Sequence, residues 1–277
     1  IAGVLEAECS ALLKDFFRGL RRKGCGVPEL PEVETVRRSL APMVGRRIVA
    51  ARLHRPDVCT TATGRRPRPE ELLAAARVES LARHGKQLAI LASGGRVLVV
   101  HLGMSGQLRL LPRGGNLAQR DHIHADWMLD DGSLLIFRDP RRFGGLWTLE
   151  SQSALRDRWS TLGPDALTMK PADLHTAATG SARAIKALLL DQTAIAGIGN
   201  IYADEALFAA GIRPARRASS LTAQERLRLA RAIKTVLERA VEARGSSLRD
   251  YMDADGRRGE AQLRHAVYGR SGLECLR

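Results

Sequence analysis

The chain has 277 residues and a mass of 30.2 kDa, which is enough for two ordinary domains or one large one. Apolar residues make up 44% of it, so the chain can bury a core, and the 4% of aromatic residues leaves Leu, Val, Ile and Ala to fill that core. Four cysteines over this length exclude a disulfide-rich secreted scaffold, and no stretch approaches the roughly 18 apolar residues of a membrane span.

The net charge of +14 comes from 44 Lys and Arg residues against 30 Asp and Glu residues. It fits a polyanionic partner, because Lys and Arg release counterions from phosphates; the alternative explanation is a genome whose base composition favours Arg and Ala. Residues 1–27 hold five basic and three acidic residues, so they contribute +2 and the rest of the chain carries +12. The basic excess therefore belongs to the body of the protein.

The first 27 residues are basic and only mildly apolar. Glu6, Glu8, Lys14 and Asp15 interrupt the continuous apolar stretch that a signal peptide needs, so we expect no targeting address here. We expect residues 1–27 to be an extension that arises from upstream translation or serves as a pro-segment.

Residues 28–154 predict a β-rich domain with one leading helix. Pro31 suits the first turn of a helix, Glu32 and Glu34 add favourable negative charge there, and apolar residues recur at helical spacing over 33–40. This density of short strands indicates an antiparallel sandwich or barrel. Short, often alternating runs between Gly-rich turns predict the strands, at 46–53, 78–81, 87–91, 97–102, 107–111, 124–129 and 133–138.

Residues 155–250 predict a helical domain. Helical periodicity covers 184–190, 201–210 and 222–243, and Thr222 with Glu225 forms a capping-box pattern. A glycine-rich turn at 196–200 leads into the second of these helices. Residues 251–277 are polar and loop-like. The expected fold class is therefore α+β, with an N-terminal antiparallel β-sandwich followed by helices.

Five short segments combine residue types that suit catalysis or DNA contact. They are Pro28–Glu34, Ala82–Lys86, His101–Gly106, Asp139–Gly145 and Gly197–Leu207. Each is a weak to moderate signal alone, but in this order they closely resemble the formamidopyrimidine-DNA glycosylase family, over about nine-tenths of the chain from Pro28 to Cys275. The resemblance implies base-excision repair of 8-oxoguanine and formamidopyrimidines in duplex DNA, together with abasic-site lyase activity.

The resemblance assigns catalysis to Pro28, Glu29 and Lys86. A proline at a free chain terminus is a secondary amine with a pKa of ~8, so it can attack C1′ of the deoxyribose and form a Schiff base. Glu29 matches the general acid/base that protonates the opening sugar. Lys86 matches the lysine that assists proton transfer during 3′-side strand cleavage; without the resemblance it would be read as a solvated loop lysine.

The resemblance also assigns DNA contacts, since the damaged nucleotide must leave the base stack before its C1′ can be reached. Met104 matches an apolar wedge that fills the gap, Phe143 the residue that stacks beside it, and Arg141 the arginine that bonds the orphaned base. A core position is the alternative for Met104 and Phe143.

The 196–200 turn looks like the family's helix–two-turn–helix, where backbone N–H groups at a helix start hold a phosphate. Asn200 would add a donor there, and Lys186 is a plausible phosphate neighbour. Arg120 stands where the family commonly has histidine, and arginine can also hold a phosphate. The alternative for the turn is an ordinary packing element.

The sequence departs from the family at its four-cysteine zinc finger. Only Cys275 matches, whereas tetrahedral zinc needs four ligands. We therefore expect a truncated finger in residues 251–277 and no metal or other cofactor in this chain, although the full-length family carries zinc.

The expected partner is double-stranded DNA that contains oxidised purines or abasic sites, bound by a monomer in the bacterial cytoplasm, at the nucleoid and not at a membrane. Two rivals remain. If Pro28 stays internal, the chain is a catalytically silent DNA-binding homologue. A structural nucleic-acid module is the other, but it has no need for Lys86, Met104 or Arg141.

Overall fold

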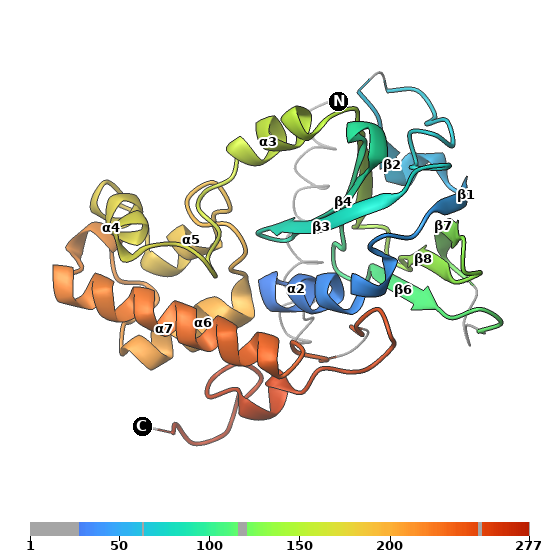
Figure 1. The fold of residues 1–277 in the computed structure, drawn as a ribbon. Helices are drawn as coiled ribbons and strands as arrows, with labels where there is room; N and C mark the ends of the chain where they lie inside the picture. Colours follow the sequence, from blue (N-terminus) through green and yellow to red (C-terminus); the bar gives the residue numbers. More distant parts are fainter. Residues whose placement is uncertain (1–27, 63, 116–120, 249–250, 277) are drawn as a thin grey trace, which may run out of the picture.

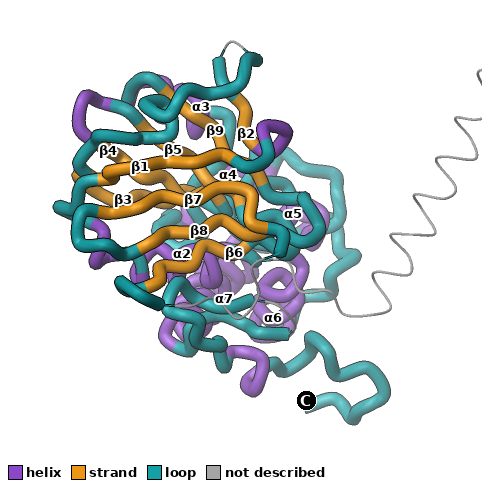
Figure 2. The backbone as a smooth tube through the Cα atoms, turned by 90° about the vertical axis from the view of Figure 1, so that its right-hand side faces the viewer, coloured by secondary structure: helices purple, strands orange, loops and turns teal. Residues whose placement is uncertain are grey.

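Two β-sheets packed face to face form the N-terminal part of the protein (Figure 2). The computed structural model describes residues 28–62, 64–115, 121–248 and 251–276. The sheets have the strand orders β1-β7-β8-β6 and β2-β9-β5-β4-β3, and every pair except the parallel β2–β9 pair is antiparallel. The strands are β1 (Ile48–Leu53), β2 (Cys59–Thr60), β3 (Val78–His84), β4 (Gln87–Ala92), β5 (Val97–His101), β6 (Gln107–Leu111), β7 (Ile123–Leu129), β8 (Leu134–Arg138) and β9 (Gly145–Leu149).

Helices make up most of the C-terminal part (Figure 1). The longest, α7, begins with the predicted capping box: Thr222 Oγ1 accepts from the Glu225 backbone N–H, and the Glu225 carboxylate accepts from the Thr222 N–H. The helices are α2 (Leu30–Ser39), α3 (Gln152–Ser160), α4 (Pro171–Thr179), α5 (Ile185–Leu190), α6 (Asn200–Ala210) and α7 (Ala223–Glu242), with a short 3₁₀ turn at Ala261–Arg264 in the tail.

The α+β prediction is confirmed, and the seven predicted strands correspond to β1 and β3–β8. The sequence patterns do not predict the short β2 and β9, or helices α3 and α4. Both helices are largely solvated: α3 buries Leu155 alone, and α4 buries Leu174 and Ala178. So few buried positions leave little apolar periodicity in the sequence to detect.

Helix α2 joins two hydrophobic cores. Leu30, at its start, packs in the helical core with residues of α5, α6 and α7. Val33, Val36 and Leu40 pack in the sandwich core with Phe137 and its neighbours. The residues just before α2 are therefore placed where the two cores meet, and Figure 1 shows α2 between the strands and α7.

The predicted extension 1–27 and Arg120 lie outside the described residues. Within the described part of the chain, no helix combines the length and the apolar character that crossing a membrane requires.

Candidate active site and nucleic-acid interface

Glu29 directly precedes α2, and its side chain lies against the N-terminus of helix α6. The residue is 1% exposed. Its carboxylate accepts hydrogen bonds from the backbone N–H groups of Gly199, at 2.7 Å, and Ile201, at 2.8 Å, with a longer one from Tyr202 at 3.3 Å. These donors have no partner within the helix, so a buried carboxylate is well placed to satisfy them. A Cβ on Gly199 would lie 2.3 Å from the Glu29 carboxyl carbon, so this approach requires glycine.

The surroundings of Glu29 change its acidity. Burial raises the pKa of Glu29 to about 7, and the Lys86 charge and the α6 N–H groups only partly offset the loss of hydration. Both protonation states are therefore populated near neutral pH, as a general acid or base requires.

Lys86 lies in the two-residue turn between β3 and β4 and is half-buried. Burial lowers the pKa of the Lys86 ammonium, while the nearby Glu29 and Glu32 carboxylates oppose this change. The same charge interaction appears in the pKa of Glu29, which Lys86 lowers. The structure thus brings together two predicted catalytic groups that are 57 positions apart in the sequence, and Pro28 directly precedes one of them.

Glu32 is a second buried carboxylate beside this pair, although the sequence pattern indicates only a helix-start residue. It accepts hydrogen bonds from the Tyr202 hydroxyl and the Ser246 N–H, both at 2.6 Å, and from the Glu29 N–H at 2.8 Å. Burial raises the pKa of Glu32, and these donors lower it. Its partners beyond α2 come from α6 and from the segment after α7, which sequence spacing does not reveal.

Met104 and the Arg141–Phe143 segment lie on two neighbouring turns, β5–β6 and β8–β9. Buried Asp139 ties them together, since its carboxylate accepts from Ser105 Oγ at 2.6 Å and from the Gly144 N–H at 2.7 Å. A Cβ on Gly103 would lie 2.3 Å from the Gly144 nitrogen, so the two backbones are in direct contact. Met104, the predicted wedge, and Phe143, the predicted stacking residue, therefore lie on turns that the same carboxylate holds together.

The side chains on these turns are accessible. Phe143 is 46% exposed, which excludes the core position that the sequence leaves open for it. Met104 is half-buried, and the Arg141 guanidinium carbon lies 5.4 Å from the centre of the Phe143 ring. An exposed aromatic ring beside a guanidinium group can stack on bases and contact their edges.

The two remaining described DNA candidates lie in the helical part. Asn200 is the first residue of α6 and is exposed, so its side chain is accessible at a helix start. The Lys186 ammonium forms an ion pair with Asp204 of α6 at 2.7 Å. A phosphate contact by Lys186 would have to compete with this carboxylate.

The described residues of the C-terminal segment do not fit a zinc site. Cys275 is exposed, and among the described residues no group of three His, Cys, Asp or Glu side chains gathers in a geometry that could hold a metal ion.

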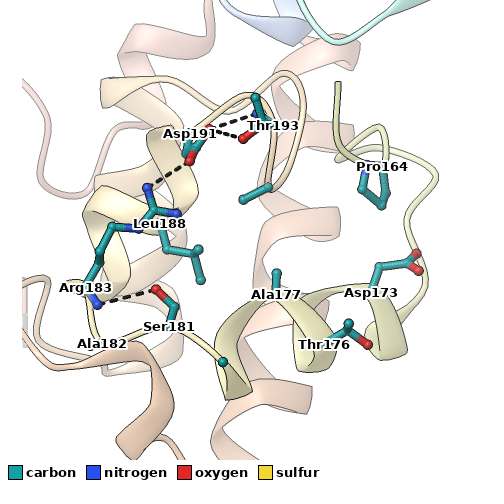
Figure 3. Close-up of a pocket in the computed structure, with 12 residues that line it drawn as sticks. Pro164, Asp173, Thr176, Ala177, Ser181, Ala182, Arg183, Leu188, Asp191 and Thr193 are labelled. Atoms are coloured by element: carbon teal, nitrogen blue, oxygen red, sulfur yellow. Dashed lines mark hydrogen bonds and ion pairs between the residues drawn. The ribbon is translucent and has the colours of Figure 1, made fainter. Parts of the chain in front are cut away.

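A cavity of about 750 Å³ lies apart from these residues, beside α4 and α5 (Figure 3). Asp191, which lines this cavity, accepts hydrogen bonds from Arg183 and Thr193. Its lining includes none of the predicted catalytic or DNA-binding residues, so it is not the candidate active site.

Two family models match this chain. The formamidopyrimidine-DNA glycosylase N-terminal domain matches residues 27–146, and the formamidopyrimidine-DNA glycosylase H2TH domain matches residues 162–252. Formamidopyrimidine-DNA glycosylases from Xanthomonas axonopodis pv. citri and Heliobacterium modesticaldum are 42% and 43% identical to it. The first alignment covers 90% of this chain and 91% of the relative, and the second 91% and 92%.

Solved structures agree with the sequence comparison. The MutM (Fpg) protein from Thermus thermophilus is 42% identical, with a TM-score of 0.78 and 90% of each chain covered. Lactococcus lactis Fpg in complex with DNA that contains an abasic site is 30% identical, with a TM-score of 0.79, covering 90% of this chain and 91% of that one. Matches of this length and identity, over the fold and the motifs described above, show that the chain belongs to the formamidopyrimidine-DNA glycosylase family.

Proposed function

We propose that this protein removes oxidised purines, 8-oxoguanine and formamidopyrimidines, from duplex DNA and then cleaves the strand at the abasic site. One observation carries the proposal: Glu29, with a pKa of about 7, is buried beside Lys86 and directly follows Pro28. The solved Lactococcus lactis relatives, bound to Fapy-dG-containing DNA and to abasic-site DNA, support the two substrate classes.

The proposed chemistry begins at the nitrogen of Pro28. With a free N-terminus, this secondary amine attacks C1′ and the bond to the damaged base breaks; the departing base takes up the proton that the nitrogen loses. Protonated Glu29 donates its proton to the ring oxygen as the sugar opens, which leaves an iminium ion between Pro28 and C1′.

Strand cleavage then requires loss of a proton from C2′ and departure of the 3′ phosphate. We assign assistance of this proton transfer to Lys86. Its lowered pKa supports the assignment, because a larger fraction of the amine is neutral and able to accept a proton.

DNA binding is assigned to the two turns and to the helical part. Met104 would fill the gap left by the flipped nucleotide, Phe143 would stack beside it, and Arg141 would bond the orphaned base. Arg120, Lys186 and Asn200 would contact phosphates, in keeping with the charge of +12 carried by residues 28–277. We further propose residues 28–154 as the catalytic domain, 155–250 as the DNA-binding domain and 251–277 as a C-terminal linker segment.

Borohydride trapping on lesion-containing duplex tests this mechanism, because borohydride reduces the iminium to a stable covalent complex. A chain that begins at Pro28 should be trapped, whereas the 277-residue chain, whose Pro28 nitrogen is a tertiary amide, should not. Intact-mass measurement must confirm both N-termini. Equal trapping of the unprocessed long chain would remove Pro28 from its role, and no trapping of either would favour the catalytically silent homologue.

A further inference from the structure

Asp165, in the segment between α3 and α4, hydrogen-bonds the turn that carries Lys86. Its Oδ2 accepts the Gly85 backbone N–H at 2.7 Å, and the residue is 8% exposed. Gly85 has a φ of +55°, and a Cβ there would lie 2.9 Å from the Ala196 Cβ. The Gly85–Lys86 turn is thus hydrogen-bonded to the Asp165 side chain and in close contact with the turn that contains Ala196.

Arg83, on strand β3, also hydrogen-bonds Asp165 and the Lys86 turn. Its guanidinium donates to Asp165 through two nitrogens, at 2.5 and 3.1 Å, and its Nε donates to Glu34 of α2 at 3.1 Å. All three side chains are between 6% and 8% exposed. The Arg83 Nη1 also donates to the Gly85 carbonyl at 2.9 Å, so the group that binds Asp165 also holds the Lys86 turn. A planar, forked cation between two carboxylates fixes orientation as well as distance.

The backbone around Asp165 holds the other side of the active site. The Ala166 N–H donates to the Ala196 carbonyl, and the Ala196 N–H donates to the Pro164 carbonyl, both at 2.9 Å. Ala196 precedes Gly197, whose carbonyl accepts the Leu30 N–H at 3.1 Å, and the same turn ends in the N–H groups that hold Glu29. The segment 164–166 therefore touches both the turn of Lys86 and the turn that seats Glu29.

We propose that Asp165 is a positioning residue that sets the Lys86 amine relative to Glu29, and that it acts on the reaction through Lys86. The proposal rests on the proposed function of Lys86 in strand cleavage. The Asp165 carboxylate accepts hydrogen bonds from Gly85 and Arg83 on the Lys86 side and from Leu167 in its own segment. Contact with the turn that seats Glu29 comes from the backbones of Pro164 and Ala166, and Asp165 bonds neither the Lys86 nor the Glu29 side chain. A purely structural residue in its place would affect every step of the reaction alike.

Single-turnover kinetics of Asp165→Asn, introduced into the chain that begins at Pro28, separate these roles. The amide keeps the size of the side chain but replaces one accepting oxygen with a donor, so the Gly85 and Arg83 contacts cannot all persist. We expect strand cleavage of a preformed abasic site to slow about tenfold and excision of 8-oxoguanine to change less than about threefold. In a Lys86→Ala background the same substitution should cause no further loss of strand cleavage, because coupled residues are not additive.

Two further variants provide controls for this experiment. Asp126→Asn removes a comparable aspartate pair, with His54 at 2.6 Å on the sandwich surface, and should leave both steps unchanged. Asp165→Glu retains the charge but displaces it by one methylene, and it should reproduce the selective loss if Asp165→Asn folds poorly.

The titration of Lys86 is a readout independent of activity. Side-chain NMR of isotopically labelled lysine should show the pKa of Lys86 closer to its ordinary value in Asp165→Asn than in the parent chain, because the loosened turn admits water. Additive losses in the double variant, equal losses in both steps, or an unchanged pKa in both Asp165 variants would overturn the proposal. If Lys86→Ala leaves strand cleavage intact, the proposed function of Lys86 fails, and the titration alone decides whether Asp165 positions this side chain.

Discussion

The residues around Glu29 and Lys86 and the two turns around Met104 and Phe143 show two ways of building a functional surface. The first group is buried where two hydrophobic cores meet on α2, and Glu29 and Glu32 accept hydrogen bonds from segments 170 to 214 residues away in the chain. The second group extends from short turns, and Asp139 supports it within a span of about 40 residues. Burial shifts the pKa values of Glu29 and Lys86, whereas the side chains on the two turns remain accessible to a binding partner.

This difference predicts which property each substitution should change when it is introduced into the chain that begins at Pro28. Alterations at the buried group should act on the chemical rate and on the pH dependence, because desolvation sets its charge states. Substitutions on the turns should slow the reaction on base-containing substrates more than on abasic substrates, because only base-containing substrates require a base to be displaced.

The largest effect is expected for Glu29→Gln. Glutamine retains an oxygen that can accept N–H groups of α6, but it cannot donate a proton to the opening sugar. Excision of 8-oxoguanine in single turnover should fall about 10²–10⁴-fold. Circular dichroism should show an unchanged fold, and a variant within threefold of the parent would assign the proton to another group.

The same substitution should change the pH dependence of stability. The pKa of Glu29 is raised from 4.5 to about 7 in the folded protein, so its contribution is fully present below pH 4.5 and is lost as pH rises through about 7. Relative to Glu29→Gln, the parent chain should lose about 3 kcal/mol of unfolding free energy between pH 4 and 8. Urea unfolding at several pH values measures this, and parallel curves for the two proteins would show that burial does not raise this pKa.

Met104→Ala is expected to have a smaller and substrate-selective effect. Without the wedge, displacing a base is less favourable, so excision from an 8-oxoguanine duplex should fall about tenfold, while cleavage of a preformed abasic site changes much less. Steady-state and single-turnover rates on the two duplexes provide the comparison. Equal losses on both would indicate that Met104 serves packing.

Asp139→Asn should produce the smallest effect, a loss of a few-fold with the same substrate preference as Met104→Ala. The amide weakens the charge-assisted bonds to Ser105 and Gly144, so the two turns lose some of their mutual order. Asp131→Asn is the matched control, because Asp131 likewise accepts a serine hydroxyl and N–H, but in the β7–β8 turn. A loss on abasic DNA as large as that on lesion DNA would argue against a role in base displacement.

Much of the fold could be predicted because its signals are local. Alternating strands, the capping box before α7 and the helical periodicity of α5–α7 each depend on residues within a few positions of one another. Helices α3 and α4 escaped prediction because they bury little, and the two-residue β2 is too short to carry a pattern.

The sequence by itself determined the class of the fold, the order of the motifs and the residue types available for chemistry. Only the tertiary structure decided that Glu29 occupies the N-terminus of α6, that Arg83 lies between Glu34 and Asp165, and that Asp139 joins two turns. The physical reason is that desolvation and long-range hydrogen bonding arise only when distant segments pack together. Periodicity and spacing describe each segment alone, whereas the charge of a buried carboxylate depends on every segment that excludes water from it.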